Sequence, residues 1–332
     1  MNKIVYSAYL CVIILVLLEI TVRICGYSEA NIYDPIYMPF EKSDSIPYIH
    51  KPNLNNVRAP GSIIINTDSL GLRSETAGAK YGPKQSDEYR IAVIGDSVTF
   101  GVGVKRTKDI FSQVMEDILN KRQHDVRVKV FNYAAAAYSV KEMASTLQYR
   151  MLEVEPDLVI MAIIHDDLDL TRTPSVDKWG YFYNKRTSGN ISQDSLTKQL
   201  LRKIHSAYFL RDVVLKIIAG KKKLNVAPVT GISESYKYIK KFKSIANDNK
   251  LSYAVVLLNA RDDEEWKMLS KQLIHDKITY IDTSQIYNEL IASKYTKEEL
   301  KASIFDNHPS AIVHRKIGEK LADIIQKELR VK

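Results

Sequence analysis

The sequence predicts an α/β fold of three layers, in which a parallel sheet lies between two layers of helices. Amphipathic stretches of helical period, such as residues 110–119 and 140–152, separate short apolar runs. Strands that are apolar on successive residues and alternate with helices are typical of a parallel sheet covered on both faces. We therefore expect a doubly wound, flavodoxin-like sheet of about five strands. The five apolar runs are residues 90–95, 126–134, 157–164, 252–259 and 278–283.

Length and composition set the broad class of the protein. The chain has 332 residues, of which 45% are hydrophobic and 26% charged, so it can bury a sizeable core. The formal net charge is +9, but the lysines are spread along the sequence and no nucleic-acid-binding motif accompanies them. We expect no nucleic-acid partner and interpret the excess charge as a solvated surface, with an anionic polymer or lipid headgroup as the alternative.

A hydrophobic segment at the N-terminus predicts a transmembrane anchor. Residues 4–24 read IVYSAYLCVIILVLLEITVRI, about the length that a helix needs to cross the hydrocarbon layer of a membrane. Glu19 and Arg23 interrupt the run near one end, where they can pair on one face of the helix. No small-residue cleavage site or lipobox follows the run. We therefore expect an uncleaved anchor over residues 1–26 that binds the lipid bilayer.

The side of the membrane that carries the soluble part depends on weaker signals. Lys3 lies at one end of the segment and Arg23 at the other, so the positive-inside rule gives little asymmetry. The two cysteines, Cys11 and Cys25, lie in or beside the anchor, which leaves the soluble part without a thiol that would mispair in an oxidising compartment. We expect an extracytoplasmic soluble part, on the periplasmic or outer face of the membrane.

Beyond the anchor the sequence divides into a linker, a body and an insertion. Residues 27–88 are rich in Pro, Asn, Ser and Tyr and predict extended segments that wrap the body, which we place at residues 89–332. An insertion at about residues 168–231 separates the third and fourth strands. It is either a structural element or a helical cap whose aromatic rings stack on sugars or acyl chains. Its aromatic residues include Trp179, Tyr181 and Tyr183.

A serine follows the first strand of the predicted sheet. The chain reads RIAVIGDSVTF from Arg90, so Ser97 lies at the carboxyl end of the strand, where a doubly wound sheet places its site. A hydroxyl there, with backbone N–H groups nearby, suits a nucleophile whose oxyanion those groups stabilise. A Ser or Asp after a strand is also a common helix cap. A phosphate-binding loop is not supported, because its glycine and lysine spacing is absent.

Asp306 and His308 lie two residues apart, just before the last amphipathic stretch. In an extended turn, such positions project to the same side, so a carboxylate can orient an imidazole that acts as acid and base. Together with Ser97, this pair predicts a Ser-His-Asp triad. No group of His, Cys and Asp has metal-ligand spacing, so we expect neither a metal nor a cofactor.

These motifs make the chain resemble the SGNH, or GDSL-like, hydrolase superfamily, in particular its membrane-anchored members. The stretch GDS from Gly95, with Gly101 after it, matches the first block of the family, and DNHP from Asp306 matches the last. The stretch INTDSLGLRS is similar to the N-x-x-G-x-R segment before the first strand, and the likeness covers about residues 66–329. The resemblance implies that Ser97 is the nucleophile, His308 the base and Asp306 the residue that orients it.

The two middle blocks depart from the family pattern. Where the family has N-x-G-x-x-G, the chain keeps Asn132 but places Ala134 and Ala137 at the glycine positions. Where the family has G-x-N-D, the chain reads IHDD, so Asp166 replaces an asparagine that donates an N–H to the oxyanion. A protonated Asp166 can donate a hydrogen bond, whereas an ionised one cannot. The resemblance places Ser97, Ala134 and Asp166 in the oxyanion hole, and Asp96, Asn132, His165 and Asp167 around it.

Three functions are compatible with these motifs. The leading one is a membrane-anchored serine esterase that removes an acyl group from a carbohydrate or lipid through an acyl-enzyme. An O-acyltransferase that passes an acyl group, such as acetyl, to a polysaccharide hydroxyl uses the same residues. The third is a binding module with weakened catalysis, since an ionised Asp166 repels the oxyanion and the loss of one donor costs on the order of a hundredfold in rate.

Overall fold

A five-stranded parallel sheet forms the centre of the computed structural model, which describes residues 3–27, 32–122, 125–184, 203–221, 232–258 and 264–329. The strand order is β12-β11-β8-β6-β7. Counted along the chain this is the order 2-1-3-4-5, so the predicted doubly wound, flavodoxin-like topology is confirmed. The strands are β6 (Glu88–Ile94), β7 (Arg127–Asn132), β8 (Leu158–Ile163), β11 (Ser252–Leu257) and β12 (Tyr280–Asp282).

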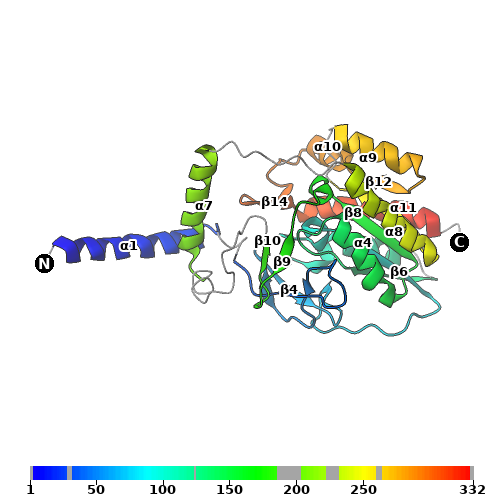
Figure 1. Cartoon of the computed structure of the whole chain (residues 1–332), viewed down its shortest axis with the longest axis horizontal. Coiled ribbons are helices and arrows are strands. Elements are labelled where there is room, and N and C mark those ends of the chain that lie inside the picture. The colour runs from blue at the N-terminus through cyan, green and yellow to red at the C-terminus, as the bar shows by residue number, and fades with distance from the viewer. Residues whose placement is uncertain are drawn as a thin grey trace.

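Helices cover both faces of this sheet (Figure 1). Successive residues of β6 point to opposite faces, so Ala92 and Ile94 pack in one apolar core while Ile91 and Val93 pack in the other. All four side chains are fully buried, which explains why the strand is apolar at each position from Ile91 to Ile94. The helices of the first core are α4 (Val140–Tyr149), α8 (Ile232–Asp248) and α9 (Glu264–His275). Those of the second are α3 (Phe111–Arg122), α10 (Gln285–Ala292) and α11 (Ala311–Leu329).

One predicted helix is shorter in the structure than its apolar pattern suggests. Helix α4 begins at a capping box formed by Ser139 and Glu142, but it ends at Tyr149, and a 3-10 turn, η2 (Met151–Val154), follows. Arg150 leaves the helical conformation between them, and its Nη2 donates to the carbonyl oxygen of Leu70 at 2.7 Å. The helix thus ends at a residue that contacts a distant segment, and the local pattern carries no signal of that contact.

The segment between the anchor and the sheet contributes to the core of the body. Its short strands form two antiparallel sheets, and Tyr37, Tyr48 and Ile63 are fully buried against the face that carries α4 and α8. Arg73 donates to the carbonyl oxygens of Gly101 at 2.8 Å and Val104 at 2.5 Å. The segment therefore supports the loop that follows β6. Its strands are β1 (Tyr37–Met38), β2 (Ile49–His50), β3 (Val57–Ala59), β4 (Ile63–Thr67) and β5 (Arg73–Ser74).

The insertion after β8 begins with a 3-10 turn, η3 (His165–Leu168), and a small hairpin, β9 (Pro174–Val176) and β10 (Phe182–Asn184). It continues with helix α7 (His205–Lys221), which packs against the N-terminal helix rather than against the sheet. Residues 185–202 and 222–231 lie outside the described residues. A cap over the crevice therefore stays a prediction.

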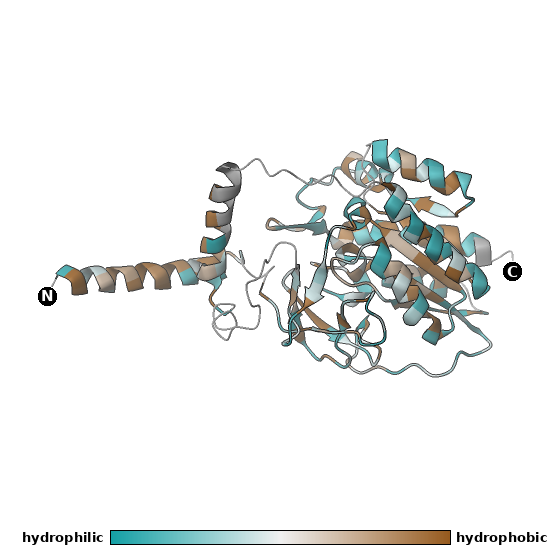
Figure 2. Ribbon diagram, viewed as in Figure 1, coloured by the Kyte–Doolittle hydropathy of each residue, from teal (hydrophilic) through white to brown (hydrophobic). Residues whose placement is uncertain are grey.

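The predicted anchor forms a single helix, α1 (Lys3–Ile24), that projects from the body (Figure 1). Its most apolar window has a mean hydropathy of 2.4, and no part of that window is buried (Figure 2). Among the described helices it is the one that is long and apolar enough to cross a membrane. A signal sequence has the same features, so its retention as an anchor is a proposal.

We expect an Arg73→Ala substitution to destabilise the protein. Arg73 is 6% exposed, and its loss leaves the buried carbonyl of Val104 without this donor, while the carbonyl of Gly101 keeps the Val104 N–H as its donor. An unpaired buried polar group costs about 1–3 kcal/mol, so the free energy of unfolding falls by about 2 kcal/mol or more. Denaturant titration measures the change. Arg58→Ala, at an exposed position of the same segment, is the control, and equal midpoints for the two variants would refute this role of Arg73.

Candidate active site

The structure brings Ser97, His308 and Asp306 together at the carboxyl end of β6. Ser97 begins a one-turn helix, α2 (Ser97–Phe100), directly after the strand, and the other two residues lie in β14 (Asp306–Pro309). His308 Nε2 is 3.0 Å from Ser97 Oγ, and His308 Nδ1 is 2.5 Å from Asp306 Oδ1. Because β14 is extended, its residues two apart project to the same side, as the sequence predicts. The imidazole therefore lies between the hydroxyl and the carboxylate.

The turn after β6 contains a helix cap as well as the serine. Asp96 is the cap: its Oδ1 accepts a hydrogen bond from the backbone N–H of Val98 at 2.9 Å. This leaves the Ser97 hydroxyl with two acceptors, His308 Nε2 and Asp96 Oδ2, the latter at 3.2 Å. The helix cap is therefore Asp96, and the adjacent Ser97 stays the predicted nucleophile.

A glycine lets the strand with His308 approach the serine turn. Strand β14 pairs antiparallel with β13 (Lys301–Ser303), and Ala302 of β13 packs against Gly103 of the loop that follows α2. A Cβ at Gly103 would lie 2.3 Å from the Ala302 Cβ, and the φ of Gly103 is +80°, which side chains disfavour. Gly103 is not among the predicted site residues, although the GVGV stretch at residues 101–104 signals a tight turn.

The charges of the three residues favour a proton acceptor at His308. Burial alone lowers the pKa of His308, but the hydrogen bond and charge of Asp306, together with the charge of Asp96, raise it above its usual value. Burial raises the pKa of Asp306, but its hydrogen bonds with His308 lower it below the usual range. An ionised Asp306 therefore holds the imidazole and stabilises its protonated form.

Two further carboxyl groups lie buried behind the serine. Asp96 and Asp167 are 2% and 0% exposed, and burial raises the pKa of both, with the charge of Asp96 as a second cause for Asp167. Asp167 accepts from the backbone N–H of Ile164 at 2.9 Å and from Arg172 Nη2 at 3.1 Å. Asp167 therefore fixes the turn after β8. Arg172 belongs to no motif, so the sequence carries no local signal of this role.

The loop after β7 does not place the predicted donors as expected. The Ala134 N–H, predicted for the oxyanion hole, donates instead to Asn132 Oδ1 at 3.1 Å. Asn132 Nδ2 in turn donates to the carbonyl oxygen of Thr99 at 2.7 Å, so Asn132 joins this loop to α2. Ala137 has a φ of +62°, in the region that favours the glycine found at this place in the family. Within the described residues, the backbone N–H groups of Ser97 and Ala137 donate no hydrogen bond.

The turn after β8 places Asp166 toward solvent. The Asp166 side chain is 63% exposed, and its Oδ1 is 3.9 Å from His165 Nδ1. The Asp166 carboxylate is therefore not enclosed by the site, in contrast to the buried Asp167. His165 Nε2 is 2.8 Å from Glu265 Oε2, which joins this turn to α9.

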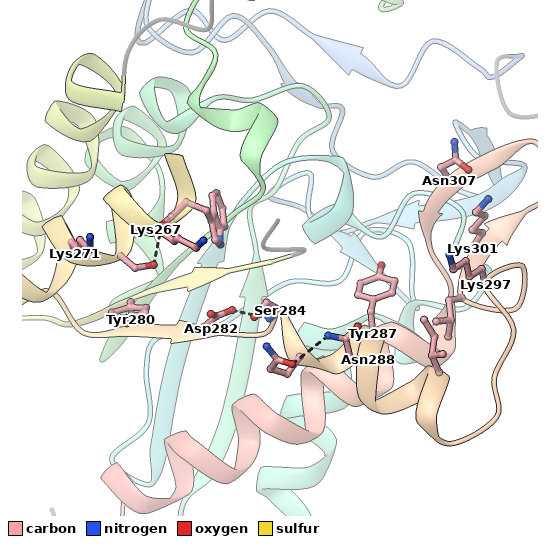
Figure 3. A pocket seen from close by; sticks show the side chains of 15 residues that line it. Lys267, Lys271, Tyr280, Asp282, Ser284, Tyr287, Asn288, Lys297, Lys301 and Asn307 are labelled. Carbon is pink, nitrogen blue, oxygen red and sulfur yellow. Dashed lines mark hydrogen bonds between the residues drawn. The ribbon is translucent and has the colours of Figure 1, made fainter. Parts of the chain in front are cut away.

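A hollow of about 1060 Å³ lies between the β13–β14 hairpin and α9 (Figure 3). Asn307 and Lys301 of the β13–β14 hairpin lie at one end and Lys267 and Lys271 of α9 at the other, with the Tyr287 ring between them. Positive charge combined with aromatic rings suits a polyhydroxylated or anionic ligand. The other aromatic and basic side chains that line the hollow are Trp266, Tyr280 and Lys297.

Comparison with known proteins finds similarity to solved structures. No family model matches the sequence, and no curated protein matches it. The chain is similar to a member of the lipolytic protein G-D-S-L family from Veillonella parvula DSM 2008, with 15% identity and a TM-score of 0.41 over 72% of this chain and 98% of that one. It is also similar to a two-domain esterase active on acetylated mannans, with 13% identity and a TM-score of 0.45 over 72% of this chain and 49% of that one. A third similar structure is that of an acetyl xylan esterase, with 11% identity and a TM-score of 0.44 over 71% of this chain and 99% of that one.

We expect Gly103→Ala to separate His308 from Ser97. The new Cβ displaces Ala302, and a displacement of about 1 Å at a reacting group costs on the order of a hundredfold in rate. The rate at which a fluorophosphonate probe modifies Ser97 measures this loss. Gly82→Ala is the control, because no atom lies within 4 Å of a Cβ there. Equal labelling rates in both variants would show that Gly103 does not position the hairpin.

Proposed function

We propose that this chain is a membrane-anchored serine esterase of the SGNH type, which hydrolyses an acyl ester on a carbohydrate or lipid. The observation that carries the proposal is the line of hydrogen bonds from Ser97 Oγ through His308 to Asp306, at 3.0 and 2.5 Å. A serine becomes a nucleophile when an adjacent base takes its proton and a third group orients that base. The three side chains meet this requirement.

The reaction proceeds in two steps. Ser97 Oγ attacks the acyl carbon while His308 Nε2 takes the hydroxyl proton, and the alcohol leaves with that proton, which gives an acyl-enzyme. A water molecule then attacks the acyl carbon and gives a proton to His308, and the acid leaves as Ser97 regains its hydrogen. Asp306 stabilises the imidazolium in both steps.

The oxyanion is stabilised mainly by backbone donors. We assign the N–H groups of Ser97 and Ala137 to this role, because the Ala134 N–H donates to Asn132. The exposed Asp166 offers no amide donor at the position where the family has one. The lack of one donor costs on the order of a hundredfold in rate, so we expect a slow esterase.

The hollow between the β13–β14 hairpin and α9 supports a carbohydrate as the alcohol part of the substrate. Aromatic rings and lysines line it, and one of its lining residues, Asn307, belongs to the same strand as His308. Helix α1 supports anchoring by residues 1–26, since its apolar surface is exposed along the helix. With Cys11 and Cys25 both at the anchor, we propose that the soluble part lies on the extracytoplasmic side.

We expect ester hydrolysis by the full-length protein to lose rate as the pH falls through the pKa of His308. The neutral imidazole is the base, and its pKa is raised, so this acid limb lies above about pH 6.5, the usual value for histidine. Asp306→Asn removes the carboxylate that raises this pKa. The variant is expected to move the limb to lower pH and to lower kcat by roughly 10³ to 10⁴. Initial rates on 4-nitrophenyl acetate against pH measure both changes.

The control for these rates is the Ser97→Ala variant, measured on a panel of acetylated and longer-chain esters. Ser97→Ala is expected to reduce hydrolysis of every ester in the panel to the background of the buffer. Activity that survives Ser97→Ala, or an acid limb that Asp306→Asn leaves in place, would overturn the assignment of the triad.

A further inference from the structure

We infer that helix α7 and the tip of the β13–β14 hairpin lie in the membrane interface and hold the active site at the bilayer surface. The inference rests on one part of the proposed function, that α1 spans a membrane. It adds a second contact with lipid to the anchor, and it narrows the substrate to an ester carried by a molecule that is itself anchored in the bilayer.

The first observation is the contact between α1 and the start of α7. Glu19, a carboxylate within the apolar helix, accepts the backbone N–H of His205 at 3.1 Å and that of Ser206 at 2.7 Å. These are the first two residues of α7, whose N–H groups have no partner within the helix. Arg23 pairs with Glu19 at 2.6 Å and donates to the carbonyl oxygen of Lys203 at 3.0 Å. The start of α7 is thus fixed at the level of the last two turns of α1.

The second observation is the direction of α7 and the face that it exposes. The helix runs across the axis of α1, between α1 and the body (Figure 1). If α1 crosses the membrane, α7 therefore lies along its surface. Leu210, Val214 and Ile217 are 43%, 51% and 57% exposed, and their spacing places them on one face. An apolar face on a helix that lies along a membrane is typical of interfacial helices.

The third observation is a contact between the hairpin that contains His308 and the end of α1. Tyr27, just beyond the end of α1, makes edge-to-face contacts with Phe209 of α7 at 5.1 Å and with Phe305 at 5.3 Å between ring centroids. Phe305 precedes Asp306 directly and forms the hairpin tip with Ile304; the two are 43% and 81% exposed. Aromatic rings are enriched where a protein leaves the bilayer. The hairpin tip is thus joined to the end of the membrane span by a single ring.

A lipid surface is the occupant that this arrangement favours. Helix α7 begins beside α1, whose own surface is apolar and exposed along the span, and its exposed apolar residues follow within the next turns (Figure 2). A bilayer that accepts α1 covers the adjoining face of α7 without any further partner. It also brings membrane-anchored esters within reach of Ser97, because Asp306 lies next to the hairpin tip.

Tryptophan fluorescence in vesicles tests this placement. The full-length chain is reconstituted in phosphatidylcholine vesicles, with or without brominated acyl chains, as Val214→Trp and as Ile304→Trp. Each new tryptophan adds its emission to that of the native Trp179 and Trp266. We expect brominated lipid to reduce this added emission by at least twofold. Lys237→Trp is the control, since Lys237 is exposed on α8 and its emission should not change. Equal emission in both lipids for Val214→Trp and Ile304→Trp overturns the inference.

Two further measurements separate this inference from the proposed function. Extraction with alkaline carbonate tests the span: a chain that is released lacks the anchor, and the inference falls with it, whatever the esterase activity. A retained chain with unquenched tryptophans refutes the inference alone. A Leu210→Ser/Val214→Ser protein is expected to hydrolyse soluble 4-nitrophenyl acetate at the wild-type rate but to lose at least fivefold on a long-chain ester embedded in vesicles. Equal loss on both esters would contradict a role at the membrane.

Discussion

The hydrogen bond between Ser97 and His308 is the constraint on which the arrangement of this protein depends. It joins residues 211 positions apart, one at the end of the first central strand and the other in a hairpin before the last helix. The sheet alone does not bring them together. The hairpin must close on the serine loop, which requires the absent side chain of Gly103, and that loop must keep its shape, which Arg73 ensures through two carbonyl groups.

Much of the fold and the pair of end motifs can be predicted because their signals are local. The five strands are apolar runs of the right length, and Asp306 and His308 face the same way because a strand has a period of two. Ser97 follows from its place after β6. The early end of α4 at Arg150 does not follow from the local sequence, and there Arg150 makes a hydrogen bond to Leu70, 80 positions away.

The parts of the site that sequence did not predict share this dependence on distant contacts. Whether the Ala134 N–H is available depends on the orientation of the Asn132 side chain, and the exposure of Asp166 depends on which of two adjacent carboxylates turns inward. Asp167 takes the buried place because Arg172 pairs with it there. From the sequence, Glu19 is interpreted as an interruption of the anchor. In the structure, its carboxylate accepts hydrogen bonds from the start of α7.

The central claim is that Ser97 carries an acyl group during turnover, and acid quench with mass spectrometry tests it most directly. The full-length protein is mixed with excess 4-nitrophenyl acetate, quenched within the first turnover and digested. An acetyl group is predicted on the Ser97 side chain, at a level that Asp306→Asn lowers, since the imidazole is then no longer oriented. Release of nitrophenol while the Ser97 peptide stays unmodified would contradict the claim.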